Sequence, residues 1–224
     1  MTRTAVIFDL DGTLTDSMPM HAEAWVKAMR EGERIEIGFD EAYAHEGEKA
    51  EEFGRYLFLK YTGSAPAEDR LVETVARYVR NYHALYETRF FPYSRELIAQ
   101  LRRHAVPIGI VSGSKDVRSR FAEYPDFIGS FDAVVTGDDT PIGKPHPAPF
   151  LKAFELLKVK AEEALVIENA PFGTRAAVAA GAECWAVLNG SPLSADDLLA
   201  LGASRAFGDL AELKSALSAR LGLR

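Results

Sequence analysis

Short apolar runs alternate along this chain with longer stretches whose apolar residues recur at helical spacing. The runs span residues 5–8, 108–111, 133–136, 164–167 and 184–188, with a weaker one at 205–207. Runs of this kind, mostly free of charge, are typical of parallel strands that are covered on both faces. Helical stretches such as 150–157 and 174–180 would form the crossovers between later strands. The pattern therefore predicts an α/β fold with a doubly wound parallel sheet.

The first two predicted strands are separated by about a hundred residues, far more than one crossover helix requires. The intervening segment carries apolar stripes at helical spacing over residues 18–30, 48–60 and 68–86. The breaks between these helices are predicted at Gly32, Gly47, Gly63 and Pro66. We therefore predict an inserted helical cap domain over residues 17–88 and an α/β core built from residues 1–16 and 89–224.

The charge balance limits the partners that the chain can bind. Its 224 residues include 33 acidic and 26 basic side chains, for a formal net charge of −7. This argues against nucleic-acid and membrane-surface binding, which require a basic face, and no run reaches the roughly 18 apolar residues of a membrane span. Cys184 is the only cysteine, which excludes an intrachain disulfide, and the N-terminal apolar run is too short for a secretory signal. We expect a cytoplasmic monomer or weak homodimer.

Two carboxylates follow the first predicted strand directly, in the segment Asp9-Leu10-Asp11-Gly12-Thr13. The carboxyl ends of parallel strands form the ligand crevice of such a sheet, so both side chains should lie at its mouth. Asp and Gly are also common in turns, and D-x-D-G begins calcium loops. The residues that follow lack the remaining ligands of a calcium loop, whereas a simple turn stays possible from this segment alone.

Three further predicted strands are each followed by polar or charged residues. Ser112 and Gly113 follow the second strand, Lys144 stands before a proline after the third, and Glu168 and Asn169 follow the fourth. Each has a plain structural explanation by itself, as a turn, a solvated charge or a helix cap. Together they bring carboxylates, a hydroxyl, an amide N–H and a cation to one edge of the sheet. That composition indicates a magnesium-assisted phosphoryl-transfer site.

With these segments the chain resembles the haloacid dehalogenase (HAD) superfamily, in the branch with a helical cap inserted after the first motif. D-L-D-G-T, the serine after the second strand, the lysine of G-K-P and E-N-A-P-F-G match the four motifs of that family in order. The resemblance covers nearly the whole chain and implies a Rossmann-like core. Within the family, the chain looks most similar to phosphatases and to mutases of the β-phosphoglucomutase type.

The resemblance implies roles for the two carboxylates of the first motif. Asp9 matches the nucleophile that attacks phosphorus and becomes an aspartyl phosphate. Asp11 matches the general acid and base, a role that requires surroundings that raise its pKa toward the working pH. Dehalogenase relatives lack an acid at this position, because a halide leaves without a proton. The presence of Asp11 therefore favours phosphate esters as substrates.

Phosphate and metal ligands follow from the same resemblance. Ser112, the Gly113 amide and Lys144 match the groups that bind the transferring phosphate. Mg²⁺ and the lysine would offset the repulsion between an anionic phosphate and an anionic nucleophile.

The metal ligands that the resemblance implies are the Asp9 carboxylate, the Asp11 backbone carbonyl and the fourth motif, with Glu168 and Asn169. Many relatives have two acids in the fourth motif, so Asn169 makes this site one negative charge weaker. Three consequences are possible: the site binds the metal more weakly, Glu168 provides the ligation, or the site has lost catalysis and only binds ligands.

The cap is expected to select the substrate. His21 matches a cap histidine of β-phosphoglucomutase and lies one helical turn from Trp25; alternatively, Trp25 packs in the cap core and His21 faces solvent. Lys49 lies in a segment similar to the substrate-facing loop of the family, although most lysines are solvated. Tyrosines at 78, 82 and 86 share one helix face, for cap packing or a dimer contact, and Cys184 is expected in the core.

These observations predict a Mg²⁺-dependent phosphatase, a phosphoric monoester hydrolase, that acts on a small phosphorylated metabolite such as a sugar phosphate. The alternative is a β-phosphoglucomutase-like mutase, in which a sugar hydroxyl accepts the phosphoryl group instead of water. A mutase needs a second phosphate site in the cap, and Glu46 and Glu48 beside Lys49 make such a site doubtful. A catalytically weakened ligand-binding relative is a further alternative.

Overall fold

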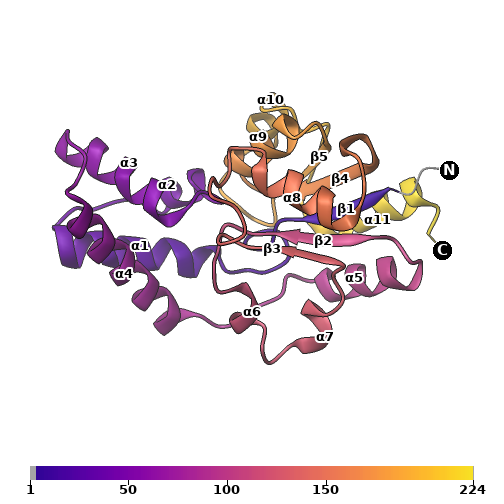
Figure 1. Ribbon diagram of the computed structural model, residues 1–224, viewed down its shortest axis with the longest axis horizontal. Coiled ribbons are helices and arrows are strands. Elements are labelled where there is room, and N and C mark those ends of the chain that lie inside the picture. Colours follow the sequence, from indigo (N-terminus) through magenta and orange to yellow (C-terminus); the bar gives the residue numbers. More distant parts are fainter. Residues whose placement is uncertain (1–3, 224) are drawn as a thin grey trace.

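The computed structural model describes residues 4–223 and contains a parallel sheet of six strands next to a separate group of helices (Figure 1). The strands are β1 (Ala5–Phe8), β2 (Ile108–Val111), β3 (Ala133–Val135), β4 (Ala164–Glu168), β5 (Glu183–Val187) and β6 (Arg205–Phe207). They are ordered β3-β2-β1-β4-β5-β6, and all neighbouring pairs are parallel. The predicted doubly wound, Rossmann-like α/β fold is confirmed.

Helices cover both faces of the sheet. Successive side chains of a strand point to opposite faces, so each strand packs against helices on both sides. On one face, Ile7 and Val111 pack with α8 (Ala148–Leu157) and α9 (Pro171–Ala179). On the other, Phe8 packs with α5 (Ser94–Arg103) and α11 (Leu210–Leu221). The remaining core helices are the short α6 (Val117–Arg120), α7 (Pro125–Ile128) and α10 (Ala195–Ala200), with a 3₁₀ turn at Ala161–Glu163. Both faces of the strands are therefore buried, which explains their almost uninterrupted apolar sequence.

The inserted segment forms a helical cap with a hydrophobic core of its own. Its helices are α1 (Met18–Glu33), α2 (Phe39–Ala44), α3 (Ala50–Thr62) and α4 (Glu68–Leu85), and they lie to one side of the sheet (Figure 1). Trp25 lies at the centre, stacked on Tyr78 with ring centroids 4.2 Å apart and edge-on to Phe53. The short helix α2 was not predicted, because six residues are too few to show a periodic pattern.

The predicted helix break at Gly32 is wrong. Helix α1 continues through Gly32 to Glu33 and ends at Arg34, which adopts a left-handed conformation. The Arg77 guanidinium on α4 packs against Gly32, and a Cβ atom there would lie 1.5 Å from it, so this flexible side chain would have to move. Gly63, by contrast, ends α3 with φ of 74°, as a C-terminal glycine typically does.

Two adjacent segments connect the cap to the core. The Asp16 amide donates a hydrogen bond of 2.8 Å to the Arg89 carbonyl, and Thr15 pairs with Phe90 as an isolated antiparallel bridge. The crossing points lie next to the predicted limits of the cap at residues 17 and 88, which stay a prediction.

Cys184 lies on β5, buried in the layer between the sheet and helices α8 and α9. Its placement agrees with the expectation of a small core residue. None of the helices within residues 4–223 combines the length and the apolar character that crossing a membrane requires.

Candidate active site

The four polar segments predicted from the sequence meet at the carboxyl edge of the sheet. Strand β1 lies between β2 and β4, so the strand order reverses direction at the point where Asp9 and Asp11 follow it. Ser112 follows β2 on one side, and Glu168 is the last residue of β4 on the other. Crevices at such reversal points are the usual ligand sites of open α/β sheets. The topology thus brings together residues that are far apart in sequence.

Lys144 is a buried cation at the centre of this edge, with 3% of its surface exposed. Its ammonium donates to Asp9 Oδ1 at 2.5 Å, to Glu168 Oε1 at 2.6 Å and to the Val111 carbonyl at 3.1 Å. All three donor positions of the ammonium are therefore used. Lys144 is thus fixed in place rather than solvated, and it has to release one of these contacts before it can bind a phosphate oxygen.

Asp9 is 4% exposed and has one free oxygen. Its Oδ1 accepts from Lys144, whereas Oδ2 has no hydrogen-bond partner among the described residues. Burial raises the pKa of Asp9; Lys144 opposes this rise, and the nearby Glu168 carboxylate adds to it. The carboxylate form that a nucleophile needs therefore depends on a cation nearby.

Asp11 is also buried, but both of its carboxylate oxygens are engaged. Oδ1 accepts from the Ser17 hydroxyl at 2.6 Å, and Oδ2 accepts from Ser112 and Ser114 at 3.3 and 3.2 Å. The Arg120 guanidinium spans both oxygens, at 2.8 and 3.0 Å. The two carboxylates of the first motif thus have opposite surroundings, one short of donors and one surrounded by them.

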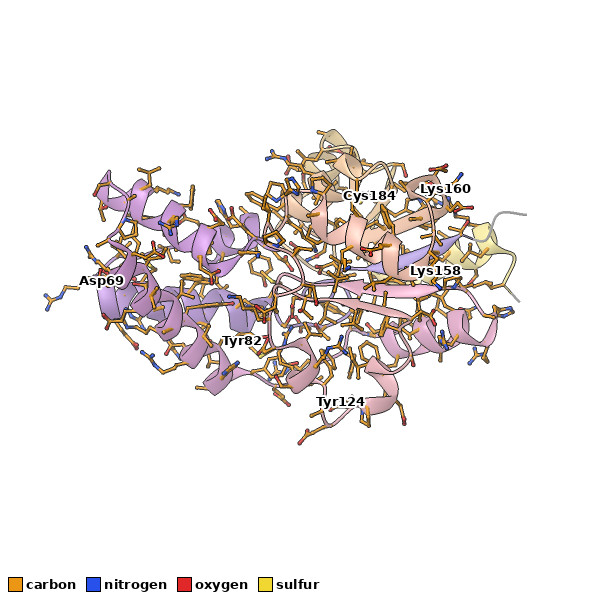
Figure 2. All side chains as sticks on the ribbon, viewed as in Figure 1. Asp69, Tyr82, Tyr124, Lys158, Lys160 and Cys184 are labelled. Carbon is orange, nitrogen blue, oxygen red and sulfur yellow. The ribbon has the colours of Figure 1, made fainter. Side chains whose placement is uncertain are left out.

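Arg120 was not predicted as a site residue. It lies on the four-residue helix α6 with 8% of its surface exposed, and it also donates to the Tyr82 hydroxyl of the cap at 2.6 Å. Figure 2 shows Tyr82 at the boundary between cap and core, far from Asp69 at the outer end of the cap. Arg120 therefore connects Asp11 of the core with Tyr82 of the cap.

The expected rise in the pKa of Asp11 is wrong for this arrangement. Burial alone would raise that pKa, but Arg120 and His21 outweigh burial and hold it well below the usual value of 3.8. The physical reason is the two-pronged ion pair with Arg120, a type of contact that stabilises the charged carboxylate strongly. Asp11 is thus held as a carboxylate, the form required of a base.

Replacing Arg120 with Met leaves the Asp11 carboxylate buried without its main cation. We expect the free energy of unfolding to fall by roughly 3 to 5 kcal/mol at neutral pH, as for other buried ion pairs that lose one partner. In the wild type, the lowered pKa of Asp11 contributes stability above about pH 4 that is lost as the pH falls further. In the variant, burial would raise this pKa, so protonation relieves the penalty and the difference shrinks on acidification.

Urea unfolding of both proteins at about pH 7 and about pH 4.5 measures the size of this effect and its direction with pH. Arg118→Met is the matched control, because Arg118 lies on the same helix and is exposed. Equal losses in the two variants at neutral pH would contradict the role of the Arg120 pair.

Glu168 and Asn169 differ in what they contact. Glu168 accepts from Lys144 through Oε1 and from the Asn169 backbone amide through Oε2 at 3.1 Å. The Asn169 side-chain oxygen accepts from the Thr13 hydroxyl at 2.9 Å. Helix α9 begins directly afterwards at Pro171, a residue suited to the first helical turn. The fourth motif therefore supports Lys144 on one side and the loop after β1 on the other.

A loop of the cap lies directly over these residues. Gly47 has φ of 82°, and a Cβ atom there would lie 3.3 Å from the Lys144 side chain. A Cβ atom on Gly113 would lie 2.9 Å from the Gly47 carbonyl oxygen. Glycine at both positions permits this close approach. The preceding residue, Glu46, is 6% exposed, and burial together with the nearby Asp9 raises the pKa of its carboxyl group well above 4.5.

Cap and core enclose a cavity of about 250 Å³ that Asp9, Asp11 and Ser112 line from the core. His21 lines it from the cap, and its Nδ1 lies 2.6 Å from the Tyr78 hydroxyl. The His21 Nε2 lies 3.6 Å from Asp11 Oδ1. His21 therefore faces the site rather than solvent, whereas Trp25 packs in the cap core.

Tyr78 and Tyr82 pack in the hydrophobic core of the cap with Trp25, and both also line this cavity. Lys49 also lines the cavity, but its ammonium donates to the Thr140 and Pro141 carbonyls at 2.8 and 3.1 Å. In this arrangement Lys49 fastens the cap loop to the core, and a role in substrate binding stays a prediction.

The donor set of the site fits a small, hard cation. No three His, Cys, Asp or Glu side chains within residues 4–223 form a metal cluster by themselves. Mg²⁺ needs no such cluster, because it commonly takes one or two carboxylates, neutral oxygens and water. The buried, unpartnered Oδ2 of Asp9 is the observation that supports a cation here. The Asp11 carbonyl and the Asn169 amide oxygen come from neighbouring segments.

Comparison with known proteins identifies the class to which this fold and site belong. A model of the haloacid dehalogenase-like hydrolases matches residues 4–181. The chain belongs to this family of hydrolases, and the predicted family and enzyme class are confirmed.

Among its relatives, a phosphoglycolate phosphatase of Nitrosospira multiformis is 30% identical over 189 residues, which cover 82% of each chain. The β-phosphoglucomutase of Bacillus subtilis is 30% identical over 207 residues, covering 87% of this chain and 88% of the relative. A hydrolase from Pseudomonas syringae has a similar structure, with a TM-score of 0.87, 26% identity, and coverage of 97% of this chain and 99% of the other. The relatives thus include both a phosphatase and a phosphosugar mutase.

Proposed function

We propose that this protein is a Mg²⁺-dependent phosphatase that hydrolyses a small phosphorylated metabolite, such as a sugar phosphate, through an aspartyl phosphate on Asp9. The observation that carries the proposal is the contrast between the surroundings of two buried carboxylates, Asp9 and Asp11. Asp9 has a free, buried oxygen facing the cavity, whereas Asp11 is held in its charged form two residues away.

In the first step, an Asp9 carboxylate oxygen attacks phosphorus and the bond from phosphorus to the ester oxygen breaks. The leaving oxygen takes a proton from Asp11, which must first acquire that proton and loosen its contact with Arg120. Ser112 would hold the phosphoryl oxygens, together with Lys144 once its ammonium exchanges one of its present contacts for the phosphate. Charge on those oxygens increases in the transition state, so fixed donors stabilise it more than they stabilise the substrate.

In the second step, water attacks the phosphorus of the aspartyl phosphate, and the bond to Asp9 breaks. Asp11, now a carboxylate again, accepts the proton of that water. Arg120 favours this form of Asp11, so the observed arrangement suits the hydrolytic half of the cycle. The cap loop at residues 46–48 would exclude other water from the site in the first step.

Asp9, the Asp11 carbonyl, Glu168 and Asn169 are the proposed metal ligands. A divalent cation bound there supplies positive charge that offsets repulsion between the phosphate and Asp9. Glu168 has both oxygens engaged, so it has to loosen its contact with Lys144 or with the Asn169 amide in order to ligate.

Hydrolysis is favoured over phosphosugar transfer by the cap side of the cavity. A mutase needs free cations there for a second phosphate. His45 pairs with Glu48 and His83 pairs with Asp116, each at 2.9 Å. Lys49 is directed to backbone carbonyls of the core. These basic side chains of the cap are thus engaged with partners within the protein.

Release of inorganic phosphate from a panel of phosphate esters with Mg²⁺ tests the proposal. We expect the wild type to release inorganic phosphate from at least one small sugar or acid phosphate. Asp9→Asn protein purified in the same way should release none. Conversion of β-glucose 1-phosphate to glucose 6-phosphate without net release of phosphate would identify a mutase instead. Binding of esters without turnover would identify the ligand-binding alternative. The cytoplasmic location and the monomeric or weakly dimeric state stay predictions.

A further inference from the structure

Glu46 is a buried acidic side chain with no cation paired to it in the described part of the chain. It comes from the cap and is 6% exposed, and neither of its carboxyl oxygens meets a donor at good hydrogen-bond geometry within residues 4–223. The Asn169 amide is its nearest donor and only partly opposes the rise that burial causes in the pKa of Glu46. Isolated buried carboxylates are costly, so such groups are normally paired or bound to a cation. The other carboxylates of the site have partners, apart from the free Oδ2 of Asp9.

The position of Glu46 relates it to the proposed metal ligands. If Gly12 carried a Cβ atom, that atom would lie 2.4 Å from Glu46 Oε1 and 2.1 Å from the Asn169 side-chain nitrogen. Glu46 and Asn169 therefore occupy neighbouring positions above the loop after β1. Asn169 presents an uncharged amide at this point, and the Asp9 carboxylate is close enough to Glu46 to interact with it electrostatically.

We infer that Glu46 is a metal-directed carboxylate, supplied by the cap to the cation site at Asp9 and Asn169. It provides the negative charge that the amide of Asn169 does not. A hard cation placed here meets carboxylate oxygens from the core and from the cap, in agreement with its preference for charged oxygen ligands. The inference rests on the proposed function only in taking a divalent cation as the resident of this site.

The cap loop is shaped to deliver this side chain. Gly47, with φ of 82°, turns the backbone immediately after Glu46 and passes over Lys144 and Gly113. Lys49 then fastens the loop to the carbonyls of Thr140 and Pro141. Because Glu46 belongs to the cap and Asp9 to the core, a cation that contacts both also joins the two parts. Metal binding and cap closure should therefore favour each other.

Calorimetric titration of the purified, substrate-free protein with Mg²⁺, and Mn²⁺ binding followed by electron paramagnetic resonance, test the inference without any turnover. We expect Glu46→Gln to raise the Kd for either ion by roughly tenfold or more. The double variant Glu46→Gln/Asn169→Asp restores a carboxylate beside the lost one and should recover most of that affinity. Asn169→Asp alone should bind Mg²⁺ more tightly than the wild type.

Glu48→Gln is the matched control, because it removes a carboxylate two residues away that is already paired with His45 at 2.9 Å. Its Kd for Mg²⁺ should equal that of the wild type. In the presence of EDTA, Glu46→Gln should unfold at the same or a higher urea concentration than the wild type, because the lost charge was unpaired. This second measurement separates a metal ligand from a side chain that merely holds the cap.

An unchanged Kd for Mg²⁺ and Mn²⁺ in a folded Glu46→Gln protein would overturn the inference, as would a double variant no better than Glu46→Gln. A higher KM for the phosphate ester with unchanged metal binding would place Glu46 on the substrate instead, and would equally overturn it. Failure of the phosphatase proposal is seen separately, as a lack of phosphate release by a wild-type protein that still binds Mg²⁺.

Discussion

Asp9→Asn is expected to lower kcat by at least about 1,000-fold, the scale seen when a covalent nucleophile is removed. An amide has no negative charge with which to attack phosphorus, and the other carboxylate of the loop, Asp11, has both oxygens engaged. The fold should stay intact. Lys144 keeps its contacts with Glu168 and the Val111 carbonyl, and the amide has nearly the same shape as the carboxylate.

Steady-state phosphate release measures kcat, and the urea midpoint reports on folding. Asp138→Asn, the same chemical change at an exposed position after β3, serves as the control and should retain wild-type turnover. Wild-type rates in Asp9→Asn would show that another group attacks phosphorus.

Lys144→Met is expected to damage both stability and activity. The substitution leaves Asp9 and Glu168 as neighbouring buried carboxylates without their shared cation, so the free energy of unfolding should fall by roughly 3 to 5 kcal/mol near pH 8. Burial already raises the pKa of Asp9, and the variant loses the main group that opposes this. An acid whose folded pKa is raised loses stability as the pH rises through the range between its unfolded and folded values. The penalty should therefore be smaller near pH 5.5.

Urea unfolding at the two pH values tests this prediction. Lys152→Met is the control, because Lys152 forms only a partly exposed ion pair with Glu155 on α8. A Lys144→Met protein as stable as this control at both pH values would show that Lys144 is not the cation that compensates the two carboxylates.

The fold could be predicted because its signals are local. The charge-free runs at β1, β2 and β4 match the observed strands to within one residue, since strands buried on both faces have to be apolar throughout. The grouping of Asp9, Ser112, Lys144 and Glu168 followed from one rule, that the carboxyl ends of parallel strands share an edge. Their convergence at one edge could therefore be predicted without knowledge of side-chain packing.

Arg120 and Glu46 could not be predicted, because their roles depend on contacts between distant segments. Arg120 lies on a four-residue helix in a stretch that has the polar composition of a surface loop, and only the packing of α6 against Tyr82 and Asp11 buries it. Glu46 lies between charged neighbours in sequence, which is typical of an exposed loop. Its burial results from the position of the cap loop over Gly12. The sequence hinted at this position through Gly47, which permits a tight approach, and through the resemblance of the segment to the substrate-facing loop of the family.

Asp11 shows most clearly how the missing contact changed the chemistry expected from the sequence. The role of general acid and base predicts a raised pKa for Asp11. That expectation took no account of Arg120, the cation that the fold brings next to Asp11. With Arg120 spanning both oxygens, the carboxylate form is favoured strongly. Release of Asp11 from Arg120 thus becomes a requirement of the first step, and Tyr82 connects that release to the cap.

Trapping of the phosphorylated enzyme tests the central claim most directly. The wild-type protein would be mixed with Mg²⁺ and a phosphate ester labelled at phosphorus, quenched in acid within the first turnover, and digested for mapping of the label. We expect acid-stable, hydroxylamine-sensitive label on the peptide that contains Asp9, and no label in Asp9→Asn. Labelled phosphate released at the full rate with no label on the protein at any quench time, or label on a peptide without Asp9, would contradict the mechanism.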